Sequence, residues 1–412
     1  MDALRLASRR NDVRPRENRP LKCYNLPHVL IVPIHEVKAG QKLALGVMNP
    51  QVRDQELLKA GFVLDESIIA RLKSIGVVQI FVDFPGLDDL DPLIMGQLSP
   101  ERQEIYRTVK NAISSNEKST QPVVKFAAYV EATRNFVKTM MGRPENQMLL
   151  DVLSKGDDEV EHATSVAHLA LVIGLKLDAY LIRERSRLPA HVAKDVTSLG
   201  VAGMLHDIGK TKLPEDLRKY HSLKLPQSET ELAEWQKHGQ YGFEMVRGGT
   251  DATVAAAVLH HHQRFDGSGF PEIDRGENKI RMSGSQIHCF ARILATADLF
   301  DRVSKAPDGT RLTNFRVLHL LKTRYRDWLD PEVVAVLPQV VPPFSPGRRV
   351  TLSDGMEGVV VGFSPYAPFQ PVVKRFDAKT MTVLDGSLDL KQHDSLRVVA
   401  LDGKPLTELE KD

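Results

Sequence analysis

The histidines of this chain are gathered in one segment. Ten of its 14 histidines lie between His162 and His288, although the chain is 412 residues long. Several of them stand beside aspartates in runs with a helical apolar pattern. Imidazole nitrogens and carboxylate oxygens are common ligands of divalent cations, and crowded imidazoles would repel one another on protonation unless a metal binds them. We therefore expect helices of this segment to pack around a metal centre.

The string "GMLHDIGKTKLP" (Gly203–Pro214) holds the adjacent pair His206 and Asp207. A histidine and an aspartate on one helical turn can supply a nitrogen and an oxygen to one or two divalent cations. Lys210 follows His206 by four residues and shares its helix face, where an ammonium suits a phosphate oxygen. A His-Asp pair alone is often just an exposed pair at a helix end, but the intact HD-x-GK string favours the metal site.

Four further strings vary in strength. "HHHQRFDGSGFP" (His260–Pro271) has three consecutive histidines before a glycine-rich loop, which packing alone explains poorly. By contrast, His238 in "HGQYG" and Asp298 in "ARILATADLFD" would each, in isolation, be ordinary helix-surface residues. His162 and His168 lie on one apolar helix, where a core histidine is the usual case, and we expect His168 to be structural.

Taken in order, these residues resemble a known signature. The series His162, His206-Asp207, His238, His261-His262 and Asp298 is similar to the metal-binding signature of the HD superfamily. The string "HHQRFDGSGFP" resembles the HHExxDGxGYP string of its HD-GYP branch, and this spacing favours His261 and His262 over His260. The resemblance covers residues 158–305 with specific motifs and the flanking modules more loosely.

The resemblance implies a function and the residues that perform it. It implies hydrolysis of cyclic di-GMP to linear pGpG, and further to GMP, by a hydroxide that two metals hold. One metal would be bound by His162, His206, Asp207 and Asp298, and the other by Asp207, His238, His261 and His262. The implied catalytic residues are Asp207 and Lys210, and the implied substrate-binding residues are Lys210, Arg264, Asp266, Gly267, Gly269, Phe270 and Pro271.

The metal and the partners are also implied. Ligands of nitrogen and oxygen without thiolate favour iron or manganese over structural zinc, and the family resemblance favours iron. It further implies contacts with GGDEF-type cyclases through the Gly269-Phe270-Pro271 loop, and it leaves a homodimer open.

The sequence departs from the family pattern at several positions. Gln263 replaces the glutamate of HHE, and Phe270 replaces the tyrosine of GYP. Asp158 stands where members with a third metal carry glutamate, so we expect two metals. Arg302 replaces an alanine, and "SKAPDGTR" replaces an RPYR-like string, so a phosphate-binding arginine is missing unless Arg311 takes its place.

These departures keep two alternative functions open. One is a catalytically degenerate HD-GYP module that binds a cyclic dinucleotide and signals through protein contacts. The other is an HD phosphohydrolase that acts on another nucleotide.

We expect a multidomain, mainly α protein in which an HD-type all-α helical bundle carries the metals. A strand-turn pattern, a helix after Asp65 that ends at Gly76, and a strand at Val77–Val82 predict a small N-terminal α+β domain. A hairpin around Asp354-Gly355 and two further strands predict a small C-terminal all-β domain. The predicted ranges are 1–24 for a basic disordered leader, 25–85 for the N-terminal domain, 86–98 for a linker, 99–335 for the helical region and 345–412 for the C-terminal domain.

Composition narrows the protein class. The formal net charge is only +2, which argues against a dedicated nucleic-acid-binding protein. The leader alone is basic, and we read it as a solvated tail, with contact to nucleic acid or an anionic lipid surface as the alternative. The 2 cysteines, Cys23 and Cys289, form no disulfide framework and so indicate a reducing compartment. We see no transmembrane run and no secretory signal, and expect a cytoplasmic protein.

Overall fold

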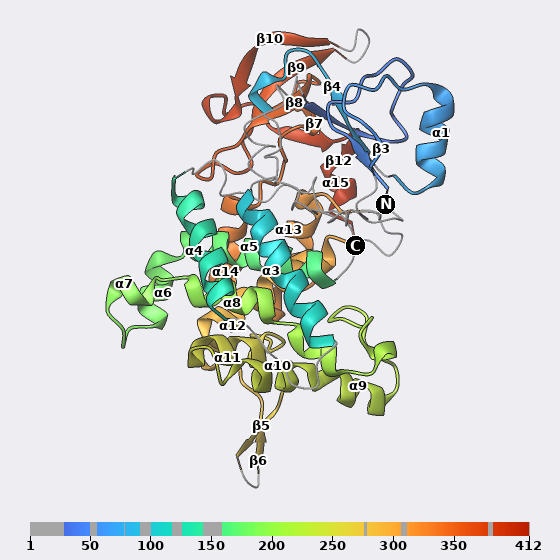
Figure 1. The fold of residues 1–412 in the computed structure, drawn as a ribbon. Helices are drawn as coiled ribbons and strands as arrows, with labels where there is room; N and C mark the ends of the chain where they lie inside the picture. The colour runs from blue at the N-terminus through green and yellow to red at the C-terminus, as the bar shows by residue number, and fades with distance from the viewer. Residues whose placement is uncertain are drawn as a thin grey trace, which may run out of the picture.

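The computed structural model describes residues 29–49, 56–77, 79–90, 100–117, 126–142, 159–275, 278–305, 311–377 and 382–411. In Figure 1 the blue N-terminal elements and the orange-red C-terminal sheet lie together above a helical region that carries the middle of the chain. The predicted leader at 1–24, most of the predicted linker, Cys23 and Asp158 lie outside these residues.

Helix α5 (Glu159–Lys176) forms the centre of the helical region. Its residues are buried without a break from Val160 to Gly174, and a helix that is buried on every side must lie inside a bundle. Helices α3 (Pro100–Glu117), α8 (Thr197–Leu205) and α12 (Cys289–Val303) pack against it. Gly203 permits the approach of α8, since a Cβ there would lie 2.7 Å from the Cα of Ala167.

The other helices surround this centre. Helix α14 (Pro331–Val340) continues past residue 335, the predicted end of the helical region, and it includes Pro338. Asp330 caps α14, because its Oδ1 accepts a hydrogen bond of 2.9 Å from the backbone N–H of Glu332. The remaining helices here are α4 (Phe126–Gly142), α6 (Asp178–Glu184), α7 (Ala190–Ala193), α9 (Glu229–Gln236), α10 (His238–Val246), α11 (Ala252–His260) and α13 (Asn314–Lys322), with 3-10 turns η3 (Ile208–Lys212), η4 (Glu215–Leu217), η5 (Gly284–Gln286) and η6 (Arg326–Trp328).

A short hairpin projects from the helical region, at the bottom of Figure 1. Its strands are β5 (Ile273–Arg275) and β6 (Asn278–Ile280), which pair antiparallel. Among the described helices, none alone has the length and apolar character to cross a bilayer. Helices α5 and α6 meet those criteria only when taken together, and they meet at an angle of 87°.

The C-terminal residues form an antiparallel sheet of six strands in the order β10-β9-β8-β7-β11-β12. The predicted hairpin is present as β7 and β8, and Gly355 in its turn has φ of +84°, which glycine adopts without strain. The strands are β7 (Arg349–Leu352), β8 (Glu357–Gly362), β9 (Val372–Asp377), β10 (Thr382–Asp389), β11 (Val398–Leu401) and β12 (Lys404–Pro405), followed by the short helix α15 (Leu406–Leu409).

The N-terminal residues form two small antiparallel pairs and one helix. Strand β1 (Val29–Pro33) pairs with β4 (Gln79–Asp83), and β2 (Val47–Met48) pairs with β3 (Glu56–Leu58). The helix expected after Asp65 is α1 (Glu66–Ser74). The Asp65 side chain caps it by accepting a hydrogen bond of 2.7 Å from the backbone N–H of Ile68.

The N-terminal elements and the C-terminal sheet share one hydrophobic core. Val359 and Phe376 of the sheet pack among N-terminal residues, and the rings of Phe84 and Phe376 lie 5.9 Å apart. Leu87, which precedes the 3-10 turn η1 (Asp88–Leu90), and Leu90, its last residue, are fully buried in this core. The start of the predicted 86–98 linker is therefore a packed segment, because its leucines are covered by the distant sheet.

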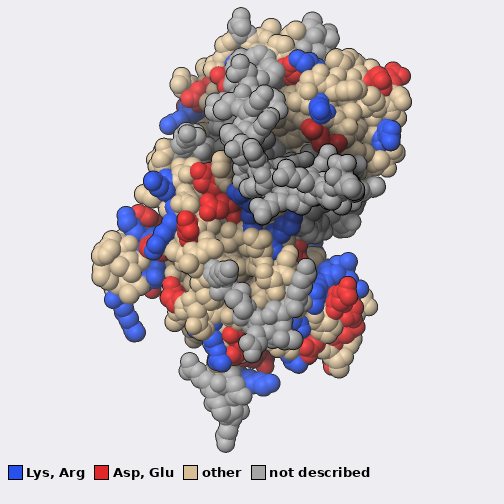
Figure 2. All heavy atoms as spheres, viewed as in Figure 1, with Lys and Arg blue, Asp and Glu red and all other residues tan. Residues whose placement is uncertain are grey.

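The surface carries both signs of charge. On the face in Figure 2, Lys and Arg lie among Asp and Glu over the described part of the helical region. This mixture accords with the small net charge of +2.

Candidate metal centre

The predicted ligands come from five separate places along the chain and meet at one point. His162 lies in α5 and Asp298 in α12, while His206 and Asp207 lie at the junction of α8 and η3. His238 is the first residue of α10, and His261 and His262 directly follow α11. Ligand atoms of Asp207, His238, His261 and His262 lie within 4.8 Å of one another, and so do those of His162, His206 and Asp298. We call these the imidazole cluster and the Asp298 cluster.

In the imidazole cluster, buried polar atoms face one another without hydrogen-bond partners. Asp207 Oδ1 lies 3.5 Å from His238 Nε2 and 3.6 Å from His261 Nε2. These three atoms and His262 Nε2 are buried and lack a partner among the described residues. An unsatisfied buried polar atom is costly, and four that converge fit a divalent cation with nitrogen and oxygen ligands.

The backbone orients three of the rings. In each, Nδ1 donates to the carbonyl oxygen three residues earlier, so the neutral ring presents Nε2 as an unprotonated ligand. The pairs are His206 with Gly203 at 2.8 Å, His238 with Trp235 at 2.6 Å, and His261 with Val258 at 2.7 Å.

In the Asp298 cluster the ligand atoms lie closer together. His162 Nε2 lies 3.1 Å from Asp298 Oδ1 and 3.2 Å from His206 Nε2. The Nδ1 of His162 donates to Asp301 Oδ2 at 2.7 Å. Because His162 and His206 both donate from Nδ1, a neutral pair would bring two lone pairs together. A cation between them, whether a proton or a metal, removes that repulsion.

Two buried cations lie against the same aspartate. Lys210 Nζ is 2.8 Å from Asp207 Oδ2, and Arg302 Nη2 is 3.2 Å from that oxygen. Arg302 Nε also lies 3.6 Å from Asp298 Oδ1. Glu159 contacts both cations, at 3.3 Å from Lys210 and 3.6 Å from Arg302. Arg311 lies elsewhere, with its Nη1 3.2 Å from Ser304 Oγ.

The electrostatics favour the metal-binding protonation states of His238, His262 and Asp207. At His206, by contrast, the effect of burial is outweighed by the carboxylates of Asp207 and Asp298, which raise its pKa. Burial lowers the pKa of His238 to about 3 and, together with the charge of His261, lowers the pKa of His262 well below its usual value. Burial alone would raise the pKa of Asp207, but Lys210 and His206 more than offset this and hold it well below its usual range. Neutral imidazoles and an ionised carboxylate are the forms that bind metals.

A glycine of the HD-x-GK string brings two of the ligand-bearing segments together. Turn η3 packs directly on α10, and a Cβ at Gly209 would lie 1.9 Å from the carbonyl oxygen of His238. Gly242, one turn further along α10, faces the same contact, with the Gly209 nitrogen 3.5 Å from its Cβ position. Asp207 and His238 can approach only because both positions lack side chains.

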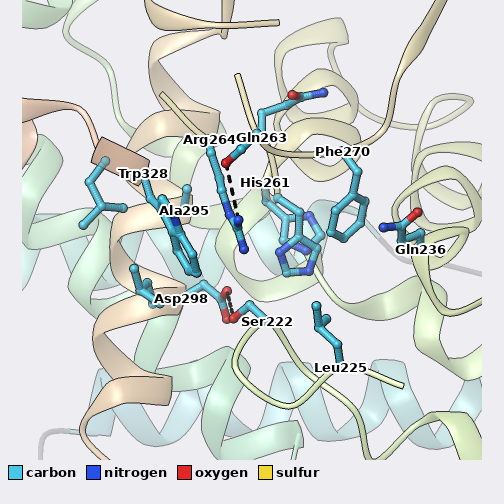
Figure 3. A pocket seen from close by; sticks show the side chains of 14 residues that line it. Ser222, Leu225, Gln236, His261, Gln263, Arg264, Phe270, Ala295, Asp298 and Trp328 are labelled. Atoms are coloured by element: carbon cyan, nitrogen blue, oxygen red, sulfur yellow. Dashed lines mark hydrogen bonds between the residues drawn. The ribbon is translucent and has the colours of Figure 1, made fainter. Parts of the chain in front are cut away.

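A pocket opens beside the centre (Figure 3). Its wall includes His261, His262, Asp298 and Ser222, whose Oγ lies 3.4 Å from Asp298 Oδ2. Arg264 extends between Trp328 and His261 in Figure 3, and its guanidinium carbon lies 3.3 Å from the centre of the Trp328 ring. Such stacking holds a guanidinium flat with its edge available for hydrogen bonds, and here Nη1 donates to Ser268 Oγ at 3.4 Å.

Phe270 and Gln263, the two substituted positions of the loop, both point into the protein. The Phe270 ring lies 4.7 Å from the ring of His262 and packs on Trp235. Gln263 is buried, and its Nε2 donates to the carbonyl oxygen of Pro271 at 2.6 Å. A carboxylate cannot make that donation, so Gln263 fits this loop better than an ionised glutamate would.

The other predicted substrate residues shape the loop. Asp266 is exposed, and its Oδ1 accepts a hydrogen bond of 2.8 Å from the backbone N–H of Ser268. Gly267 has φ of +82°. A Cβ at Gly269 would lie 2.3 Å from the Arg264 nitrogen, so no side chain fits there. Of the predicted substrate residues in this loop, the described pocket wall therefore includes Arg264 and Phe270.

Sequence reasoning missed Asp301, Glu159 and Trp328 as parts of the centre, and it noted Arg302 only as a departure from the family. Asp301 lies three residues after Asp298, a helical spacing that could have marked it. The contacts of Glu159 and Trp328, and those of Arg302 with Asp207 and Glu159, are made between residues far apart in the sequence, so no local sequence pattern predicts these contacts.

Comparisons with known proteins fall on the same region. The profile of the family described as "HD domain" matches residues 160–333. The cyclic di-GMP phosphodiesterase PA4108 of Pseudomonas aeruginosa is 25% identical over 347 residues, which cover 77% of this chain and 78% of that protein.

Two further relatives match over shorter stretches. The cyclic di-GMP phosphodiesterase response regulator RpfG of Xanthomonas campestris is 32% identical over 149 residues, 35% of this chain and 36% of that protein. The 3'3'-cGAMP-specific phosphodiesterase 1 of Vibrio cholerae is 33% identical over 132 residues, 29% of this chain and 27% of that protein.

Proposed function

We propose that this chain, whose residues 160–333 match the HD domain family, is a metal-dependent phosphodiesterase of cyclic dinucleotides, with cyclic di-GMP as its substrate. Its product would be linear pGpG, with GMP after a second cut. The relatives act on cyclic di-GMP or 3'3'-cGAMP by their names, which supports this class of substrate.

The observation that carries the proposal is the position of Asp207 between the two clusters. Its Oδ1 faces the imidazole cluster, and its Oδ2 lies 3.5 Å from His206 Nε2 and 3.7 Å from His162 Nε2 in the Asp298 cluster. A carboxylate between two ligand groups is suited to bridge two cations. We therefore assign one cation to the imidazole cluster and one to the Asp298 cluster together with Asp207.

The metals and the side chains have separate tasks. When bound, a pair of divalent metals supplies a nucleophile from water at neutral pH and neutralises charge on a phosphate. We assign to Lys210 a contact with a phosphate oxygen, since its buried ammonium lies at the bridging aspartate. We assign to Arg264, held on Trp328 at the pocket wall, a second contact with the dinucleotide.

We propose iron as the resident metal, with manganese as the alternative, because the ligands are imidazole and carboxylate without thiolate. The number proposed is two. Glu159, which follows Asp158 in the sequence, is already paired with Lys210 and Arg302.

The cyclase contact through Gly269-Phe270-Pro271 and the cytoplasmic location stay predictions. The packing of the Phe270 ring on His262 supports a role in the pocket wall. A partner would more readily meet the exposed Asp266 and Ser268 of the same loop.

The test is metal analysis followed by an activity assay on the full chain. Protein purified anaerobically without added metal is analysed by mass spectrometry and then given cyclic di-GMP under reducing conditions. About two iron or manganese ions per chain and the appearance of pGpG would support the proposal. The absence of any bound metal after reconstitution would refute it.

Two alternatives are decided by the same assay. The similarity to a 3'3'-cGAMP-specific enzyme favours a parallel assay with that dinucleotide. Faster turnover of 3'3'-cGAMP than of cyclic di-GMP would make 3'3'-cGAMP the assigned substrate. The presence of Arg302 among the ligands favours a test of the degenerate module. Metal-loaded protein that binds cyclic di-GMP but never converts it would establish a receptor in place of an enzyme.

A further inference from the structure

The two ligand clusters differ in how far their atoms are already paired. In the imidazole cluster, Asp207 Oδ1 and the Nε2 atoms of His238, His261 and His262 have no hydrogen-bond partner among the described residues. In the Asp298 cluster, the carboxylate oxygens face cations of the protein itself. A divalent ion would find unpaired ligand atoms in the imidazole cluster, but in the Asp298 cluster it would compete with positively charged side chains of the protein for the carboxylates.

Arg302 is the source of most of this competition at Asp298. Its side chain is 6% exposed, and it reaches Asp207 Oδ2, Asp298 Oδ1 and Glu159 Oε2 within 3.2–3.6 Å. Both Asp298 and Arg302 belong to α12, one turn apart, so the helix itself holds the guanidinium beside the carboxylate.

The charges of the neighbourhood are close to balance. Asp207, Asp298 and Glu159 bring three negative charges, and Lys210 and Arg302 bring two positive charges in direct contact with them. A guanidinium cannot give way by losing its proton, since arginine remains charged at any physiological pH. Arg302 must instead be displaced from the carboxylates, or tolerated beside a second cation.

We propose that Arg302 is a fixed internal cation that makes the two metal positions unequal. The imidazole cluster binds its divalent ion tightly, and the Asp298 cluster binds a second ion much more weakly, because Arg302 competes for Asp207 and Asp298. The inference rests on the proposed function in taking both clusters as metal positions. It makes Arg302 a positioning residue that sets how much metal the complete centre needs.

The experiment is a titration of metal-stripped full-length protein with Mn²⁺ alone, with free Mn²⁺ followed by electron paramagnetic resonance. Wild type should show one tight and one weak ion. Arg302→Gln should tighten the weak ion by about tenfold or more, because removing a unit charge a few ångströms away matters even at an effective dielectric constant of about 20. Arg302→Lys, which keeps the charge, should fall between the two.

Arg311→Gln is the matched control. It removes a nearby arginine whose guanidinium pairs with Ser304 and whose charge acts on Asp301, which is not a ligand, and it should change the affinity of the weak ion much less than Arg302→Gln does. His261→Gln should remove the tight phase and leave the weak one. A second readout is the thermal midpoint without metal, which Arg302→Gln should lower by at least about 3 °C, since it removes one buried cation from beside Asp207 and Asp298.

The outcomes separate this inference from the proposed function. Two ions of equal affinity in wild type, or a weak ion that Arg302→Gln leaves unchanged or weakens, would overturn the inference while a normal turnover of cyclic di-GMP keeps the enzyme. If Arg302→Gln fails to fold, the wild-type titration still decides. Two unequal ions that respond to Arg302 but support no turnover would keep the inference and refute the phosphodiesterase. No bound Mn²⁺ would overturn both.

Discussion

The imidazole cluster and the Asp298 cluster differ in how one histidine, His162, is held. His238 and His261 are fixed by backbone carbonyls of their own chain segments, three residues earlier. In the Asp298 cluster, His206 is fixed in the same way by Gly203, but His162 is fixed by the carboxylate of Asp301, which is 139 residues away in the sequence. A backbone carbonyl is present whatever the side chain is, whereas one substitution removes a carboxylate. The imidazole cluster is therefore robust to changes around it, and the Asp298 cluster depends on its neighbours.

Asp207→Asn should have the largest effect, because it strikes both clusters at once. The amide keeps the size of the side chain but brings no negative charge to either cation. We expect loss of both metals and a fall in turnover of cyclic di-GMP by at least about a thousandfold, measured by metal analysis and product chromatography. A variant that still holds two ions would show that Asp207 is not the bridge.

His261→Gln should strike the imidazole cluster alone. We expect the loss of one ion and a fall in turnover of about a hundredfold or more. The control is His260→Gln, one residue earlier, because His260 lies outside both clusters. His260→Gln should keep the wild-type metal content. An equal loss of metal in both variants would contradict the assignment of His261, and not His260, as a ligand.

Asp301→Asn should weaken the Asp298 cluster without touching a ligand. The amide oxygen can still accept a hydrogen bond from His162 Nδ1, but the negative charge that strengthens the ring as a ligand is gone. We expect the affinity of the weaker metal to fall by about 10- to 100-fold, with the tight ion unchanged in a Mn²⁺ titration. If both ions weaken together, the two clusters are not separable in the way the contacts indicate.

The smallest effect should come from His168→Leu, which lies on α5 outside both clusters. Burial, with the charge of Arg102, lowers the pKa of His168 to about 3, against about 6.5 in an unfolded chain. Between these values only the unfolded state binds the proton, so stability is lost as pH falls below about 6.5. The loss approaches about 1.4 kcal/mol for each pH unit.

The measurement is the thermal midpoint of the metal-stripped protein at pH 7 and pH 5.5. His168→Leu should lose less stability than wild type over this interval, because leucine does not titrate. Identical losses in the two proteins would mean that His168 is protonated, or reached by solvent, in the fold.

The ligand strings were predictable because each pairs a local spacing with a local structure. His206 and Asp207 at a helix end, and His261 and His262 before a glycine-rich loop, are visible without knowledge of the fold. The place of Arg302 was not predictable, since its contacts with Asp207 and Glu159 arise only when α12 packs beside α5. The donation from Gln263 to the Pro271 carbonyl likewise depends on how the loop closes.

The helices and the C-terminal hairpin were also predictable, from apolar periodicity and turn residues. The burial of Leu87 and Leu90 under the C-terminal sheet was not predictable from the sequence. An apolar residue in an acidic, proline-containing segment is typical of a linker. No local pattern indicates that strands almost 300 residues later bury it. The contact is nevertheless direct, because Lys374 donates a hydrogen bond to the carbonyl oxygen of Gly86, 288 residues earlier.

The core that the chain's two ends share has a consequence for biosynthesis. The helical region is an insertion within a discontinuous folding unit whose first half, residues 29–90, leaves the ribosome long before β8 and β9 exist to cover it. The inserted helices have a core of their own, which is complete by Val341, and can fold during that interval. The apolar face that includes Leu87 and Leu90 therefore stays exposed until the last strands have been synthesised. A chain that stalls on the ribosome after the helices would carry a folded helical region attached to an N-terminal segment whose apolar face is exposed.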